Sequence, residues 1–325
     1  MKAAFNIKVF FILLFLTFLT SVFNFNIANA LDPSETLARV NGECTGNAGG
    51  VIEAPGTTDC EVTPDSQKIT WYRVEFCTSK PTGPTTSATV DRSSCSTFYQ
   101  NDTGSEVSVV QGAGTQIGSE ADYTAIPFGN YTYGIITMGS TFKFTSSVTF
   151  DGDVSDGNGT NSSTTCVTKA STLGILYGFH SDVNTFDKGN MSCAAGAIAA
   201  EITVGVNTLS MTNNHCNHLL TFQGTSANID AFMLEADGTL VNTVGNSGNA
   251  TDQISNGDTG CTTGSANGIT RVQGIMPLDL KITADTAGIQ ISYNNTRGLS
   301  LDMSGTSDRM YKFDSAFFDF TLSAL

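Results

Sequence analysis

Thr70-Trp71-Tyr72-Arg73-Val74-Glu75-Phe76 is the stretch that decides the fold class of this 325-residue chain. Its apolar side chains Tyr72, Val74 and Phe76 face one way and the charged residues between them face the other, which is the two-residue period of a half-buried strand. The same alternation recurs at residues 96–100, 106–111, 130–138, 141–150, 201–211, 229–244, 277–283, 288–293, 299–303 and 317–325. The sequence therefore predicts an all-β protein.

A second segment, Ile126-Pro127-Phe128-Gly129-Asn130-Tyr131-Thr132-Tyr133-Gly134-Ile135, resembles the corner-and-strand pattern of immunoglobulin-like and fibronectin-type sandwiches. In those folds a Tyr at the start of a strand fixes a corner through its hydroxyl. The resemblance implies this role for Tyr131 or Tyr133, and it implies that Trp71 is the core indole of an immunoglobulin-like β-sandwich. With the strand that ends at Cys77, the chain is also similar to uncharacterised secreted β-rich proteins of aquatic bacteria, a likeness that implies no activity.

The polar residues 151–165 divide the chain. Apart from Val154, this stretch consists of Asp, Gly, Asn, Ser and Thr, so it cannot form core. We expect it to link the sandwich domain, residues 31–150, to a second antiparallel β domain, residues 166–325. Within the second domain, Asp237-Gly238 between apolar runs predicts a hairpin turn.

Residues 1–30 have the pattern of a cleavable signal peptide. Lys2 and Lys8 precede an apolar run, residues 9–23, and the small-residue box Ala28-Asn29-Ala30 follows it. The run is shorter than the roughly 20 apolar residues of a transmembrane helix. We therefore expect an exported mature chain that begins at Leu31 and has no membrane span.

The chain is acidic. Its net charge is −15, and loss of Lys2 and Lys8 with the signal would make it −17. A surface of this sign repels nucleic acid and anionic lipid, which are bound by Lys and Arg. We therefore predict no nucleic-acid partner. Solubility in salty surroundings is one interpretation of the charge, and an acidic face for cations or a basic partner is the other.

All eight cysteines follow the predicted signal, and none forms the Cys-x-x-Cys spacing that is typical of zinc sites. An even number of cysteines in an exported chain indicates disulfides, although eight thiols allow about 105 connectivities. Their spacing suggests four successive local pairs: Cys44–Cys60, Cys77–Cys95, Cys166–Cys193 and Cys216–Cys261. The second pair closes a Pro/Thr/Ser-rich loop, residues 78–94, between a strand and the next apolar stretch.

Two sets of side chains are candidate metal ligands. Asp151, Asp153, Asp156 and Asn158 offer the hard oxygens that Ca²⁺ prefers. However, Asp156 stands where a calcium loop needs Gly and no Glu closes the ring, so a solvated linker is the competing interpretation. A Ca²⁺ ion here would bind weakly, with a Kd of about 10⁻⁴–10⁻³ M. We expect no other cofactor.

The histidines His180, His215 and His218 form the second set, which could hold Zn²⁺ or Cu²⁺. His215 and His218 flank Cys216, which cannot ligate a metal if it is disulfide-bonded. A third ligand would then have to come from a distance, and ordinary surface-loop histidines are the competing interpretation.

Enzyme-like motifs occur without the context that would support them. Asp258-Thr259-Gly260 matches the core of aspartic proteases, but no apolar strand precedes it and no second copy exists. Ser247 lies in a Gly-Asn-Ser-Gly stretch that is one residue short of the nucleophile elbow. We therefore assign no catalytic residue, while paired carboxylates for glycoside hydrolysis stay open because their separation is a property of the folded chain.

The sequence thus predicts an exported, disulfide-stapled, non-enzymatic component of a cell surface, a periplasm or an extracellular fibre. Its expected partners are other surface proteins or further copies of itself, through the edge of the C-terminal strand Phe317–Leu325. Three alternatives stay open: a secreted hydrolase acting on polysaccharide, an outer-membrane β-barrel, and a carbohydrate- or ion-binding module.

Overall fold

The computed structural model describes residues 42–45, 50–53, 59–85, 87–109, 114–157, 159–170, 176–177, 190–205, 220–223, 228–240, 270–303, 309–315 and 319–325. The predicted all-β class is confirmed: within these residues the chain forms strands and turns, with one short 3-10 helix, η2 (Glu120–Asp122). No apolar helix in this part of the chain reaches the length that a membrane span needs.

The larger sheet has a long central strand, β5 (Gly129–Thr145), which pairs with β3 (Ser66–Cys77) on one side. Its other side pairs with β13 (Arg271–Ile282) and then, further along, with β10 (Ile202–Gly205). Outside these strands lie β4 (Cys95–Val109), β12 (Asn228–Leu234), β11 (Leu220–Gln223) and β8 (Leu176–Tyr177).

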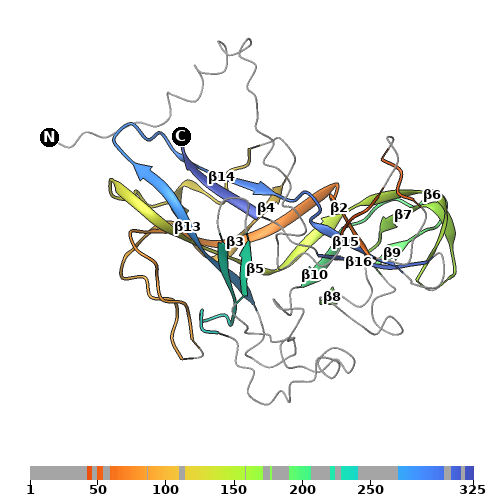
Figure 1. Ribbon diagram of the computed structural model, residues 1–325, viewed down its shortest axis with the longest axis horizontal. Coiled ribbons are helices and arrows are strands. Elements are labelled where there is room, and N and C mark those ends of the chain that lie inside the picture. The colour runs from red at the N-terminus through yellow and green to blue at the C-terminus, as the bar shows by residue number, and fades with distance from the viewer. Residues whose placement is uncertain are drawn as a thin grey trace, which may run out of the picture.

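A second sheet has seven strands, in the order β1 (Gly42–Glu43), β2 (Cys60–Val62), β15 (Leu299–Met303), β16 (Arg309–Ser315), β6 (Ser147–Asp156), β7 (Ser162–Thr168) and β9 (Met191–Ser192). Both sheets are largely antiparallel, and the parallel pairs are β1–β2, β10–β8 and β16–β6. β14 (Ile289–Asn294) and β17 (Asp319–Ala324) form a separate antiparallel pair. In Figure 1, β13 lies toward one end of the molecule and β6 and β7 lie toward the other.

One hydrophobic core joins the two sheets. Val74 and Phe76 of β3 and Phe142 of β5 belong to the same buried cluster as Phe150 of β6 and Leu301 of β15. Val74 and Phe76 therefore face a shared core, as a sheet packed face to face requires, whereas Tyr72, predicted on the same face, is outside the cluster because the register shifts between Trp71 and Arg73. Trp71 also belongs to this cluster and is 3% exposed.

The expected linker, residues 151–165, is instead largely a β-hairpin. Its first part continues β6, its last part lies in β7, and the two strands pair antiparallel. Both sheets also take strands from before and after this stretch. Asp, Ser and Thr occupy the outward positions while Val148, Phe150 and Val154 are buried, so a few inward apolar residues suffice to hold a polar segment in a sheet.

Tyr131 makes the corner contact that the sequence suggests. Its hydroxyl donates a 2.8 Å hydrogen bond to the Pro127 carbonyl, and its ring is buried beside Phe76. The bond fixes the turn that leads into β5, because it ties the first strand residues to the chain four positions earlier.

Three disulfides staple neighbouring strands: Cys44–Cys60, Cys77–Cys95 and Cys166–Cys193. These are three of the four pairs that the spacing suggests, and Cys216 and Cys261 lie outside the described residues. Cys77 and Cys95 are directly opposed in the β3–β4 pair. Each such bond closes a local loop and fixes the register of the strands that it joins.

Candidate functional site

The predicted calcium ligands Asp151, Asp153 and Asp156 do not converge. β6 alternates, so Asp151 and Asp153 are exposed on one face while Asp156 points inward and is 6% exposed. Asn158 lies outside the described residues. Among the described residues, no group of three or more His, Cys, Asp or Glu side chains is arranged to hold a metal ion.

Asp156 anchors the β6–β7 turn. Its carboxylate accepts hydrogen bonds from the Thr160 amide at 2.9 Å and from the Asn161 side-chain amide at 2.8 Å. Its backbone carbonyl accepts a third bond from Gly159, whose φ of 64° lies in the left-handed region that favours glycine. The carboxylate therefore satisfies turn donors, the usual role of Asp in such loops.

Replacing Asp156 with Ala should lower the free energy of unfolding by about 1–2 kcal/mol, because the Thr160 and Asn161 donors lose their acceptor. Denaturant titration measures the loss. Asp153→Ala, on the exposed face of the same strand, is the matched control and should stay within about 0.5 kcal/mol of the parent. A Ca²⁺-dependent stabilisation that the parent shows and Asp156→Ala lacks would contradict the turn-anchor role.

The histidine candidates His180, His215 and His218 lie outside the described residues, as do the enzyme-like motifs around Ser247 and Asp258. The candidate sites in the described part of the chain are two groups of buried charges that the sequence does not single out. One lies under a loop of the larger sheet and the other on a face of the second sheet.

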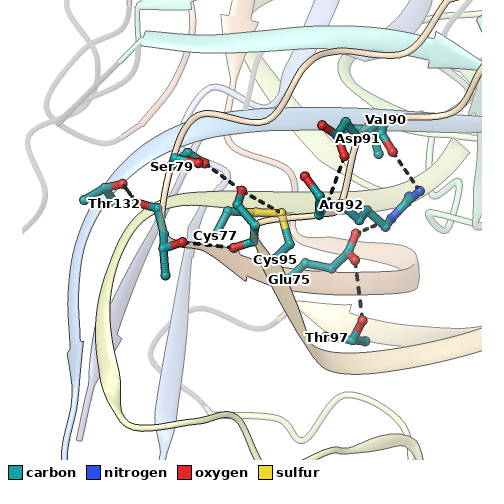
Figure 2. The surroundings of a disulfide bond; sticks show 12 residues. Glu75, Cys77, Ser79, Val90, Asp91, Arg92, Cys95, Thr97 and Thr132 are labelled. Carbon is teal, nitrogen blue, oxygen red and sulfur yellow. Dashed lines mark hydrogen bonds and ion pairs between the residues drawn. A yellow bond between two sulfur atoms is a disulfide. The ribbon is translucent and has the colours of Figure 1, made fainter.

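The first group, the Glu75 cluster, consists of Glu75, Arg73, Arg92 and Thr97. The Glu75 side chain is 1% exposed, and its two carboxylate oxygens lie 3.0 Å from Arg73 Nε and 2.9 Å from Arg92 Nε. The Thr97 hydroxyl donates a further, 3.4 Å bond to the same carboxylate and accepts a bond from Arg73. Figure 2 shows Glu75 between Arg92 and Thr97, beside the Cys77–Cys95 disulfide.

Glu75 is buried because the loop of residues 78–94 covers its side of the sheet. Glu75 and Cys77 share a face of β3, and Val90 of the loop packs with Cys77 in a small apolar cluster on that face. Near the start of the loop, Lys80 contacts Asp230 at 2.9 Å, and this hydrogen bond raises the pKa of Lys80. Gly83 approaches Phe232 so closely that an added Cβ would lie 2.6 Å from its ring.

The geometry of the Glu75 cluster favours a structural role, holding the loop to the sheet, over a catalytic one. The carboxylate accepts hydrogen bonds from the Arg92 guanidinium and the Thr97 hydroxyl, and it forms an ion pair with Arg73. Arg92 belongs to the loop and Arg73 to the strand, so the shared carboxylate ties loop to sheet. The ion pair between Arg92 and Glu75 therefore lies beside the Cys77–Cys95 disulfide.

The second group, the buried charged row, consists of Glu61, Arg297, Ser300, Asp302 and Lys312. In β15, Leu299, Leu301 and Met303 face the core, so Ser300 and Asp302 face the opposite side. Ser300 is paired in register with Glu61 of β2, and Asp302 with Lys312 of β16. Yet Glu61, Arg297, Ser300 and Lys312 are all 5% exposed or less.

Arg297 is the most constrained member of this row. It has a φ of 62°, a left-handed backbone conformation that is uncommon outside glycine. Its guanidinium lies 2.9 Å from the Glu61 carboxylate, and its backbone N–H donates to the Thr63 hydroxyl at 3.1 Å. The ion pair and this bond hold the turn between β14 and β15 against β2, which offsets the conformational strain.

Neither group could be identified from the period of the strands. Alternation places Glu75, Glu61 and Lys312 opposite the core, where charged side chains normally meet solvent. Glu75 is buried because residues of the 78–94 loop cover it, and Glu61 and Lys312 are 3% and 4% exposed; the sequence carries no local signal for this burial. No protein-family model, curated protein sequence or solved structure matches the chain, so its chemistry rests on its own residues.

Proposed function

We propose that the protein is an exported, non-enzymatic structural or binding component of a cell surface, a periplasm or an extracellular fibre. The proposal rests on the positions of the cysteines and of the buried charged side chains. Disulfides and buried ion pairs connect neighbouring strands or fasten a loop to a sheet. These disulfides and ion pairs suit a structural protein, because each of them resists the separation of adjacent chain segments.

Export is supported by the disulfides, since these bonds persist in oxidising compartments. The charge distribution supports a partner other than nucleic acid. Lys68, Lys80 and Lys143 on the surface are each paired with a carboxylate of the fold, as are the more buried Arg73 and Arg92. The charges of these five cations are therefore balanced by carboxylates within the fold.

An immunoglobulin-like sandwich is the finer architecture that we propose for the first half of the chain. The Tyr131–Pro127 bond supports it, as does the buried Trp71. The remainder of the sandwich would be completed by strands from the second half, because β13 and β10 flank β5.

Association is proposed to use β17. Within the described residues, β17 pairs with β14 alone. The Leu325 N–H and carbonyl both bond to the β14 side, at Gly288 and Ala287, so the corresponding groups of Ala324 point to the outer edge. No Lys or Pro blocks this edge between Asp319 and Leu325, and such an edge is a template for another strand.

Ala324→Pro tests this role, because it removes one outward N–H without touching the β14 pairing. We expect the parent to self-associate as its concentration rises in sedimentation velocity, and the Pro variant to stay a folded monomer. Ala324→Val keeps the N–H and is the matched control, which should assemble like the parent. A parent that stays monomeric at high concentration and hydrolyses a panel of polysaccharides or peptides would show the proposed function to be wrong.

A further inference from the structure

Lys312 and Asp302 form an unusual pair within the buried charged row. They are directly opposed on the antiparallel strands β16 and β15, and Lys312 Nζ lies 3.9 Å from Asp302 Oδ2. Their side chains are only 5% and 18% exposed. The register shifts beside this pair, which leaves Tyr311 as an extra residue on β16. A bulge of this kind re-aims the neighbouring side chain.

We propose that the Lys312 amine and the Asp302 carboxyl condense into an amide, a covalent crosslink between β15 and β16. The nitrogen attacks the carboxyl carbon, a C–N bond forms, a C–O bond breaks and one water leaves. No oxidant, reductant or further reactant is needed. The inference goes beyond the proposed structural role and does not depend on any partner.

Burial supplies the reactive form of both groups. Moving one proton from the ammonium to the carboxylate converts the ion pair to a neutral amine and a carboxylic acid, with no proton exchanged with solvent. A poorly solvated site favours the neutral pair because it penalises each charge. A desolvated lysine amine is the nucleophile that such a pocket activates.

The fold also holds the two groups together. β15 lies between β2 and β16, and the Met303 N–H, next to Asp302, donates a 2.8 Å bond to the Asp59 carboxylate. Reacting groups that are fixed side by side react far faster than the same groups free in solution. The product also removes the desolvation cost of two buried charges.

Other pairs in the same molecule are internal controls. Glu75 and Glu61 are paired with guanidinium groups, which remain protonated and are not nucleophiles. Lys68 lies closer to its partner, 2.6 Å from Glu201, but the two side chains are 35% and 39% exposed. Solvent reaches that pair and the hydrogen bond with Glu201 raises the pKa of Lys68, so we expect it to stay uncrosslinked although its atoms are nearer.

Tryptic mapping of the reduced and alkylated full-length protein tests the proposal. We expect no cleavage after Lys312 and a branched peptide in which residues 298–309 are joined to residues 310–325, lighter by about 18 Da, the mass of one water. Lys312→Arg should release residues 298–309 as an unmodified linear peptide. Chain isolated unfolded in denaturant should yield the unmodified peptides and gain the branched one only after refolding.

The parent protein alone decides the matter if the variant fails to fold. Folded parent that yields residues 298–309 and 310–312 as unmodified peptides, with no branched product, overturns the proposal and leaves an ordinary ion pair. A crosslink at Lys68 and Glu201 as abundant as the one at Lys312 would also overturn it, because burial would then not be the cause.

Discussion

Replacing Arg73 and Arg92 together with Met should lower the free energy of unfolding by about 3–5 kcal/mol, the cost of leaving a buried charge without its partners. Glu75 is 1% exposed and would lose both guanidinium groups. The Thr97 hydroxyl alone would remain to solvate it. Chemical denaturation monitored through Trp71, the single tryptophan of the chain, measures the loss.

A triple variant provides the control. Adding Glu75→Gln to the double variant removes the uncompensated charge and should restore most of the lost stability, because a neutral amide costs much less to bury. Each single Arg variant should cost clearly less than the double, since one guanidinium still faces the carboxylate. A triple variant that is no more stable than the double would show that lost packing, rather than charge, causes the effect.

Replacing Cys166 and Cys193 together with Ala should cost about 3 kcal/mol or slightly more in the loop-entropy description. The two sulfurs close a loop with a sequence separation of 27, and both residues are 0% exposed in the shared core. The loss therefore combines freedom regained by the unfolded chain with a small core void. Thermal and denaturant unfolding of the variant and the parent give the difference.

The Cys77→Ala/Cys95→Ala variant is the matched comparison. Its loop, with a separation of 18, is also closed by bonds between Thr78 and Ser94 and by the Arg92–Glu75 ion pair. These contacts keep the two ends of the loop together after the sulfurs are gone, so we expect a smaller loss. A larger loss of stability here than at Cys166–Cys193 would mean that the Arg92–Glu75 ion pair depends on the disulfide.

The strands were predictable where the sequence alternates on a short scale. Thr70–Phe76 lies within β3, and the Asp237-Gly238 turn exists, with Glu235 N–H bonded to the Thr239 carbonyl at 2.9 Å. Local pairs could also be inferred, as the three disulfides illustrate. The order of strands could not, because β5 meets β13 through a contact between residues more than a hundred positions apart.

The candidate sites were hidden for a related reason. A period of two identifies two faces of a strand, but it does not say whether the polar face is covered. Glu75 looks like a solvent-facing residue in its own strand, and only the packing of residues 78–94 over it makes it a buried carboxylate. Asp156 shows the opposite case, since its cluster of acidic neighbours suggested an ion although turn donors occupy its carboxylate.

The placement of the disulfides also governs how the chain would respond to a pulling force. Each bond joins segments that are already adjacent, so the residues between its two cysteines cannot be drawn out when the fold ruptures. At about 3.5 Å per extended residue, the loop between Cys166 and Cys193, with its separation of 27, withholds about 90 Å of length. The loop between Cys77 and Cys95, with its separation of 18, withholds about 60 Å more. Under tension the oxidised protein therefore behaves as a short tether, and a reductant would lengthen it in discrete steps.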